Sequence, residues 1–100
     1  MTTAVIHVRD ADWSDPDTVY IGRPMPRQRL AGSRWANPYR ITRDQPRETV
    51  LDLYRDYLMT HRPDLVASIS ELRGKRLACW CKPDHACHGD ILAELAEAAG

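Results

Sequence analysis

The sequence contains no phenylalanine, and only seven of its 100 residues are aromatic, three of them tryptophan. The core must therefore be built mainly from valine, isoleucine, leucine and alanine. The sequence also has no apolar run of about 20 residues and no charged segment followed by an apolar leader, which predicts a soluble, cytoplasmic protein. A chain of this length has room for one small domain, which we expect to span residues 1–100.

Net charge and a disulfide framework are absent as well. The 14 basic and 14 acidic residues balance, which argues against a protein whose whole surface binds polyanions or membranes. The three cysteines are odd in number, and two of them are separated by a single residue. This spacing predicts thiols in a reducing compartment rather than paired disulfides.

What the sequence does contain is a cluster of reactive side chains near its C-terminal end. All three cysteines and two of the four histidines lie between Cys79 and His88. A β-strand is predicted here, and its alternation would place Cys79 and Cys81 on one face and Trp80 on the other. The apolar pattern after Asp90 predicts a helix with Asp90 as its N-cap. Cys87 and His88 would then lie in the strand-to-helix crevice, where backbone N–H groups favour anions and thiolates.

Three interpretations of this cluster are open. In the first, three thiolates and one imidazole form a tetrahedral zinc site, a common ligand set. Its ligands would be Cys79, Cys81, Cys87 and His88. In the second, Cys87 is a catalytic nucleophile, His88 or His85 is its base, and Asp90 orients the histidine if it is not the helix cap. In the third, the cysteines are small buried hydrophobes and the turn is held by its own side chains.

Residues 22–43 carry positive charge alone, because six arginines occur there without an acidic residue. The prolines and glycines among them predict a long irregular loop, and such loops are often functional. Arginine beside aromatic rings suits phosphate binding and base stacking, whereas the alternative is a solvated loop paired with acidic residues elsewhere. The predicted ligand-binding residues are Arg23, Arg34 and Arg40 for phosphate, Trp35 for stacking and Asn37 for a polar edge.

The remaining patterns predict the fold. Residues 3–8 and 18–21 are short, apolar and β-branched, as in buried parallel strands. Asp44 and Pro46 are expected to open a helix. Its buried stripe would consist of Val50, Leu51, Tyr54, Tyr57 and Leu58. Pro63 is expected to open a second helix that ends at a left-handed Gly74. The order of elements predicts a single small three-layer α/β domain, with a short, mostly parallel sheet of three to four strands and helices on its faces.

Several segments together resemble domain of unknown function 4326, a family of phages and actinobacteria. They are residues 19–23, 37–41, 72–75, 77–83 and 87–90, so the similarity spans nearly the whole chain. A strand followed by Cys-His at a helix start is also similar to domain of unknown function 488. The resemblance implies a small α/β fold and, for a phage protein, the host cytoplasm. It brings no established activity.

From the residues we predict a protein directed at a nucleotide, a nucleobase or nucleic acid, with a thiol-dependent hydrolase or transferase as the enzyme class. The alternative is a non-catalytic, zinc-stabilised adaptor that binds nucleic acid or a host protein. Both hypotheses require the arginine-rich loop and the cysteine turn to meet at one concave site.

Overall fold

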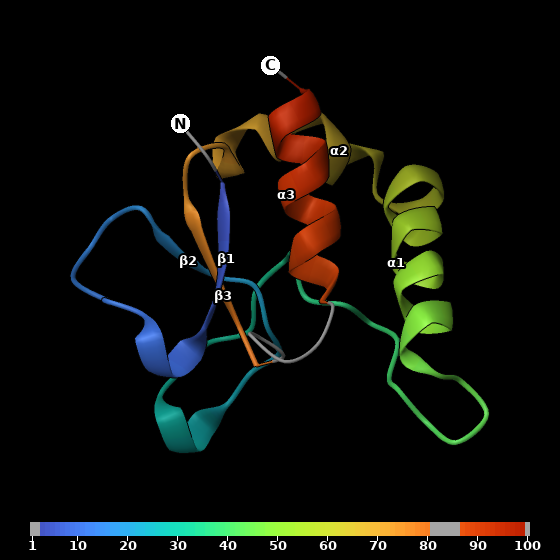
Figure 1. Ribbon diagram of the computed structural model, residues 1–100, viewed down its shortest axis with the longest axis horizontal. Helices are drawn as coiled ribbons and strands as arrows, with labels where there is room; N and C mark the ends of the chain where they lie inside the picture. The colour runs from blue at the N-terminus through green and yellow to red at the C-terminus, as the bar shows by residue number, and fades with distance from the viewer. Residues whose placement is uncertain (1–2, 81–86, 100) are drawn as a thin grey trace.

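The computed structural model describes residues 3–80 and 87–99. Within these residues, the chain forms a sheet of three strands. They are β1 (Ala4–His7), β2 (Thr18–Tyr20) and β3 (Arg76–Cys79). β3 lies in the middle and runs parallel to both neighbours (Figure 1). Leu77 of β3 is in register with Val5 of β1 and Val19 of β2, so one apolar row crosses the sheet.

Three α-helices complete the fold: α1 (Arg47–His61), α2 (Pro63–Ala67) and α3 (His88–Ala98). Short 3-10 helices are η1 (Val8–Asp10), η2 (Pro26–Gln28) and η3 (Ile69–Leu72). α3 packs against β1, β3 and η3, and α1 packs against α2 and α3 (Figure 1). The small α/β fold with a parallel sheet is thus confirmed. None of the described helices combines the length and apolar character needed to cross a membrane.

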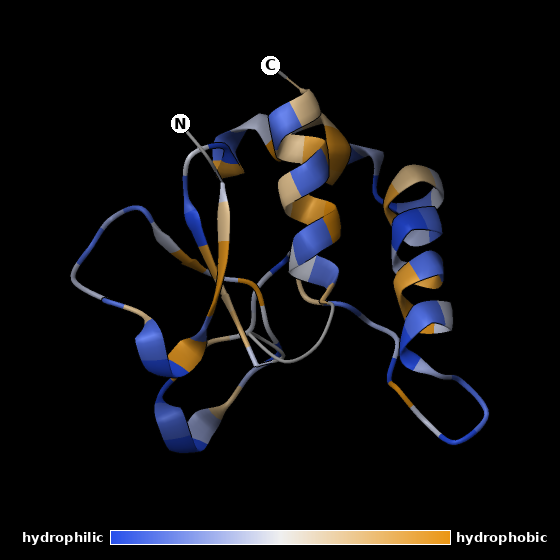
Figure 2. Cartoon of the chain, viewed as in Figure 1, coloured by the Kyte–Doolittle hydropathy of each residue, from blue (hydrophilic) through white to orange (hydrophobic). Residues whose placement is uncertain are grey.

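The core lies between the sheet and the helices. Helices α1 and α3 each carry apolar residues on one side and hydrophilic residues on the other (Figure 2). Tyr54 is completely buried, as its place in the apolar stripe of α1 predicts. The other large side chains that are less than 2% exposed are aliphatic: Ile21, Leu58, Leu65, Leu72, Leu77 and Leu92.

Three helix boundaries differ from the sequence-based expectation. α1 begins at Arg47 with Pro46 as N-cap, because the backbones of Thr42 and Gln45 bond to each other and hold the preceding residues in a turn. The segment after Pro63 divides into α2 and η3 instead of forming one helix. Gly74 does adopt the expected left-handed conformation, with φ 75°.

The third difference concerns α3, whose N-cap is Cys87 and not Asp90. The Asp90 carboxylate accepts the backbone N–H of Cys87 at 2.9 Å, while the Cys87 sulfur accepts the N–H of Gly89 at 3.4 Å. Asp90 therefore stands at the third helical position of a capping box, in which cap and third residue satisfy each other's backbone donors. The helix begins earlier than predicted, and His88 is its first residue.

Candidate ligand-binding and thiol site

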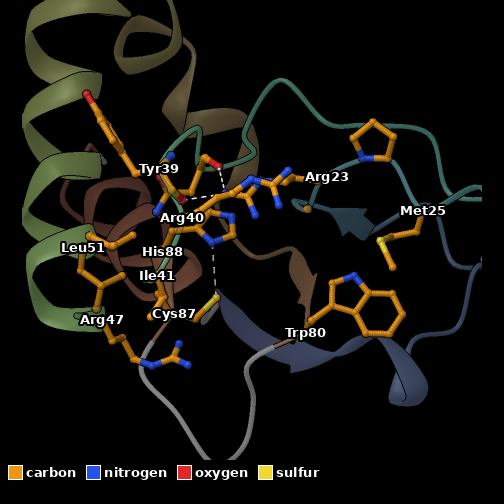
Figure 3. Close-up of a pocket in the computed structure, with 14 residues that line it drawn as sticks. Arg23, Met25, Tyr39, Arg40, Ile41, Arg47, Leu51, Trp80, Cys87 and His88 are labelled. Atoms are coloured by element: carbon orange, nitrogen blue, oxygen red, sulfur yellow. Dashed lines mark hydrogen bonds between the residues drawn. The ribbon is translucent and has the colours of Figure 1, made fainter. Parts of the chain in front are cut away.

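A pocket of about 600 Å³ lies where the arginine-rich loop meets the start of α3 (Figure 3). The loop after β2 contributes one wall, which includes Arg23 and Arg40. The first turns of α1 contribute a second wall with Arg47 and the apolar side chains of Val50 and Leu51. Trp80, Cys87 and His88 complete the lining. The structure thus brings the two segments that the sequence predicts to be functional to one pocket.

The pocket is cationic. Arg23, Arg40 and Arg47 line it, and none of its described lining residues is acidic. The pKa of Arg23 is lowered below its usual range, mainly by partial burial and to a smaller extent by the positive charge of Arg40. The two positively charged guanidinium groups repel each other. An anion placed between them would be attracted by both and would offset this repulsion.

Arg23 also organises the loop that forms the pocket wall. Its Nη2 atom donates to the carbonyl oxygens of Asn37 and Tyr39, at 2.9 and 2.6 Å. The Asn37 side chain is buried, and its Oδ1 accepts the N–H of Tyr39 at 2.9 Å, as in an Asx turn. Asn37, predicted to contact a polar ligand edge, therefore lines the pocket and shapes the loop at the same time.

The imidazole of His88 is fixed from two sides. Its Nε2 atom lies 2.7 Å from the carbonyl oxygen of Ile21. A carbonyl can only accept a hydrogen bond, so Nε2 carries a proton and, in the neutral ring, Nδ1 holds the lone pair. Nδ1 lies 3.5 Å from the Cys87 sulfur. The arrangement orients a base toward the thiol.

Tyr54 packs edge-on against the His88 ring, with 5.2 Å between the ring centroids. Its hydroxyl donates to the carbonyl oxygen of Trp35 at 2.6 Å. Burial, with smaller effects from Tyr57 and Cys87, raises the pKa of Tyr54 far above its usual value. Tyr54 is therefore a neutral wall that supports the imidazole.

Two predicted ligand-binding residues lie away from the pocket. Trp35 is only 3% exposed, because a core without phenylalanine uses this ring as filling. Arg34 stacks over the Trp35 ring at 4.9 Å and forms an ion pair with Glu71. We therefore leave both residues out of the proposed site.

The residues of the predicted metal and acid–base sets are distributed as follows. Cys79 and Cys87 are each only 1% exposed and belong to the core cluster, as the structural interpretation of the cysteines expects, and Cys87 also borders the pocket. Cys81 and His85 lie outside the described residues. Asp90 lines a neighbouring hollow together with His7, and its carboxylate caps α3. Within residues 3–80 and 87–99, no group of three or more histidine, cysteine, aspartate or glutamate side chains is placed to hold a metal ion.

Several pocket residues were not among the predicted site residues, and Arg47 and Trp80 are two of them. Arg47 lies only four residues beyond the arginine-rich stretch, but its place at the start of a helix concealed its relation to the loop. Trp80 was expected only to cover the opposite face of the cysteine strand, yet the strand ends at Cys79. An exposed tryptophan beside a reactive cluster was the signal that could have identified it.

Comparison with known proteins gives a family but no activity. A family model described as a domain of unknown function, DUF4326, matches residues 6–98. The chain is also 35% identical, over 86 residues, to an uncharacterized protein of Acanthamoeba polyphaga mimivirus. That alignment covers 77% of this chain but only 65% of the viral protein. No solved structure matches the chain.

Proposed function

The chain belongs to the DUF4326 family, and we propose that its domain binds a phosphorylated small molecule of the nucleotide class and acts on it through the Cys87 thiol. The observation that carries the proposal is the convergence of arginines with the Cys87–His88 pair around one pocket. The family description names no activity, so the proposal depends on this geometry.

The pocket suits a phosphate group in charge and in size. Guanidinium groups match phosphate oxygens with paired N–H donors, and Arg23, Arg40 and Arg47 all line the cavity. A volume of about 600 Å³ is within the range of small-molecule sites. An anion would relieve the repulsion between Arg23 and Arg40, which would make binding more favourable.

The thiol step follows from the pair at the start of α3. The Cys87 sulfur attacks an electrophilic carbon or phosphorus atom of the ligand, and the S–H proton passes to Nδ1 of His88. The bond to the leaving group breaks, and the leaving group takes the proton from His88. The oxygen of water in a hydrolase, or of an acceptor hydroxyl in a transferase, then bonds to the same carbon or phosphorus atom as the bond to sulfur breaks. Its proton passes to Nδ1 of His88 and from there to the sulfur, which restores the thiol. The N–H of Gly89, which already points at the sulfur, stabilises negative charge there.

Titration calorimetry with ribose 5-phosphate tests the proposal, with unphosphorylated ribose as the reference ligand. The native protein is expected to bind only the phosphorylated sugar. Arg40→Gln should weaken that binding about tenfold or more, since it removes one charged hydrogen-bond partner. The matched control is Arg43→Gln, in the same loop but outside the pocket. Absence of binding to the native protein, or equal losses in both variants, would contradict the proposal.

One observation favours a second candidate, the zinc-stabilised adaptor. Zinc bonds of about 2.3 Å to sulfur and 2.0 Å to nitrogen place two tetrahedral ligands about 3.5 Å apart. The Cys87 sulfur and His88 Nδ1 are separated by 3.5 Å. The bond from Nε2 to a backbone carbonyl is also typical of metal-binding histidines. The other ligands of this set would be Cys79 and Cys81.

Elemental analysis of the native protein separates the two candidates. One zinc ion per chain, released on unfolding, would support the adaptor. Thiol chemistry would be supported by two results together: the purified protein contains no zinc, and iodoacetamide modifies Cys87.

A further inference from the structure

We infer that Trp80 stacks against the ring of the ligand and that this ligand is a mononucleotide. The inference rests on the proposed function, because it places the phosphate at the arginines of the same pocket. Trp80 is 40% exposed and lines the pocket together with Arg23 and His88, so its ring is accessible to a ligand. It thus takes the role that the sequence assigned to Trp35, which is buried in the core.

The Trp80 ring is held in place before any ligand arrives. Its Nε1 donates to the Tyr20 hydroxyl at 2.9 Å, and that hydroxyl donates to the carbonyl oxygen of Arg23 at 2.6 Å. The His7 ring lies edge-on to Trp80, with 5.8 Å between centroids. A ring that is already oriented loses little conformational freedom on binding. The hydrogen-bond chain also ties the indole to Arg23, one of the proposed phosphate ligands.

The lining of the pocket divides into regions that match the parts of a nucleotide. Figure 3 shows Trp80 and Met25 at one end of the view, with Arg23, Arg40 and His88 nearer its middle. Met25 and Trp80 offer apolar surface to a flat ring, whereas the guanidinium groups offer donors to a phosphate. A base on Trp80 would leave the sugar near Cys87 and His88.

Charge argues for a single nucleotide rather than a nucleic acid chain. The next exposed ring beyond Trp80 is Trp13, which lies edge-on to Tyr20 at 6.3 Å. Trp13 belongs to a turn with four aspartates, at positions 10, 12, 15 and 17. Two of them pair with basic residues, Asp15 with Arg76 and Asp17 with Lys75. The remaining carboxylates would repel a phosphodiester backbone that continued past Trp80.

Titration calorimetry with adenosine 5′-monophosphate and ribose 5-phosphate tests the inference, because the two differ only in the base. The native protein should bind the nucleotide about tenfold or more tightly than the sugar phosphate. Trp80→Ala should remove this difference, so that the nucleotide and the sugar phosphate bind with about the same affinity. Trp80→Phe should keep most of it, which separates stacking from a folding defect. Trp13→Ala, a second exposed tryptophan, should change neither affinity.

The contradicting outcomes are distinguishable. If the native protein binds both compounds equally, and Arg40→Gln weakens both, the role of Trp80 is wrong while the proposed function stands. If neither compound binds, the proposed function fails and the inference fails with it. A 5′-phosphorylated tetranucleotide that bound more tightly than the mononucleotide would overturn the restriction to single nucleotides.

Discussion

The Nε2 atom of His88 lies 2.7 Å from the carbonyl oxygen of Ile21, the residue that follows β2. This bond ties the first residue of α3 to the end of the sheet and leaves Nδ1 directed at the Cys87 sulfur. The arginine-rich loop begins at the residue after Ile21. One hydrogen bond therefore positions the proposed base, thiol and phosphate-binding loop relative to one another.

The role of His88 as base predicts slower chemistry at the thiol when the imidazole is removed. His88→Ala should slow the alkylation of Cys87 by iodoacetamide at neutral pH about tenfold or more, because the substitution removes the proposed acceptor of the S–H proton. Peptide mass spectrometry measures modification at Cys87 separately from the other cysteines. His61→Ala, an exposed histidine at the end of α1, is the control. Equal rates in native protein and His88→Ala would exclude the base.

Cys87 has a structural and a chemical role that two substitutions can separate. Cys87→Ser keeps an N-cap acceptor, since serine is among the best capping residues, and should change the free energy of unfolding by less than about 1 kcal/mol. Cys87→Ala removes the cap and should cost about 1 kcal/mol more. Urea denaturation measures both. If turnover of a nucleotide substrate survives in Cys87→Ser, the thiol is not the nucleophile.

Gly89 permits the close packing of α3 on the sheet. A Cβ atom at this position would lie 2.9 Å from Val5 Cγ1 and 2.8 Å from the Cδ1 tip of Ile21. The β-branched valine is stiff, so the helix would have to shift. Gly89→Ala should therefore destabilise the protein by about 1–2 kcal/mol, despite the better helix propensity of alanine. Thermal unfolding measures this change in stability. The control is Ala98→Gly, which alters an exposed residue in the last turn of α3. A rise in the melting temperature of Gly89→Ala would contradict the packing argument.

Tyr54 predicts a change of stability with pH. Burial raises the pKa of Tyr54 in the folded chain, whereas the unfolded chain loses this proton near pH 10. Its contribution to stability is therefore fully present below pH 10 and declines as the pH rises above it, by up to about 1.4 kcal/mol per pH unit. Tyr54→Phe, which leaves the carbonyl of Trp35 without this donor, should cost about 1–3 kcal/mol at pH 7. Urea denaturation at several pH values should show this gap narrowing above pH 10, and a constant gap would contradict the prediction.

Local patterns sufficed for most of the fold. The apolar β-branched segments and the helical stripe around Tyr54 depend on near neighbours in sequence, and each appears where expected. The start of α3 was placed too late because Cys87 is an unusual N-cap, although Asp90 three residues on completes a capping box. The short bridge between Thr42 and Gln45 has no comparable sequence signal.

The site was harder to predict, because its members are joined by contacts over long sequence distances. Arginine content indicated the loop but could not separate Arg40, which lines the pocket, from Arg34, which pairs with Glu71. The same holds for the tryptophans, since only packing decides that Trp35 fills the core and Trp80 faces the pocket. Whether the sequence-predicted residues act in catalysis or in zinc binding stays a prediction.

The central claim is that the arginine-rich loop and the start of α3 form one ligand site. Chemical-shift mapping of the ¹⁵N-labelled protein during titration with adenosine 5′-monophosphate tests it most directly. The backbone amides of Arg40, Trp80 and His88 should shift together, along curves that fit a single dissociation constant. Shifts confined to the loop, or different dissociation constants for the loop and the start of α3, would contradict it.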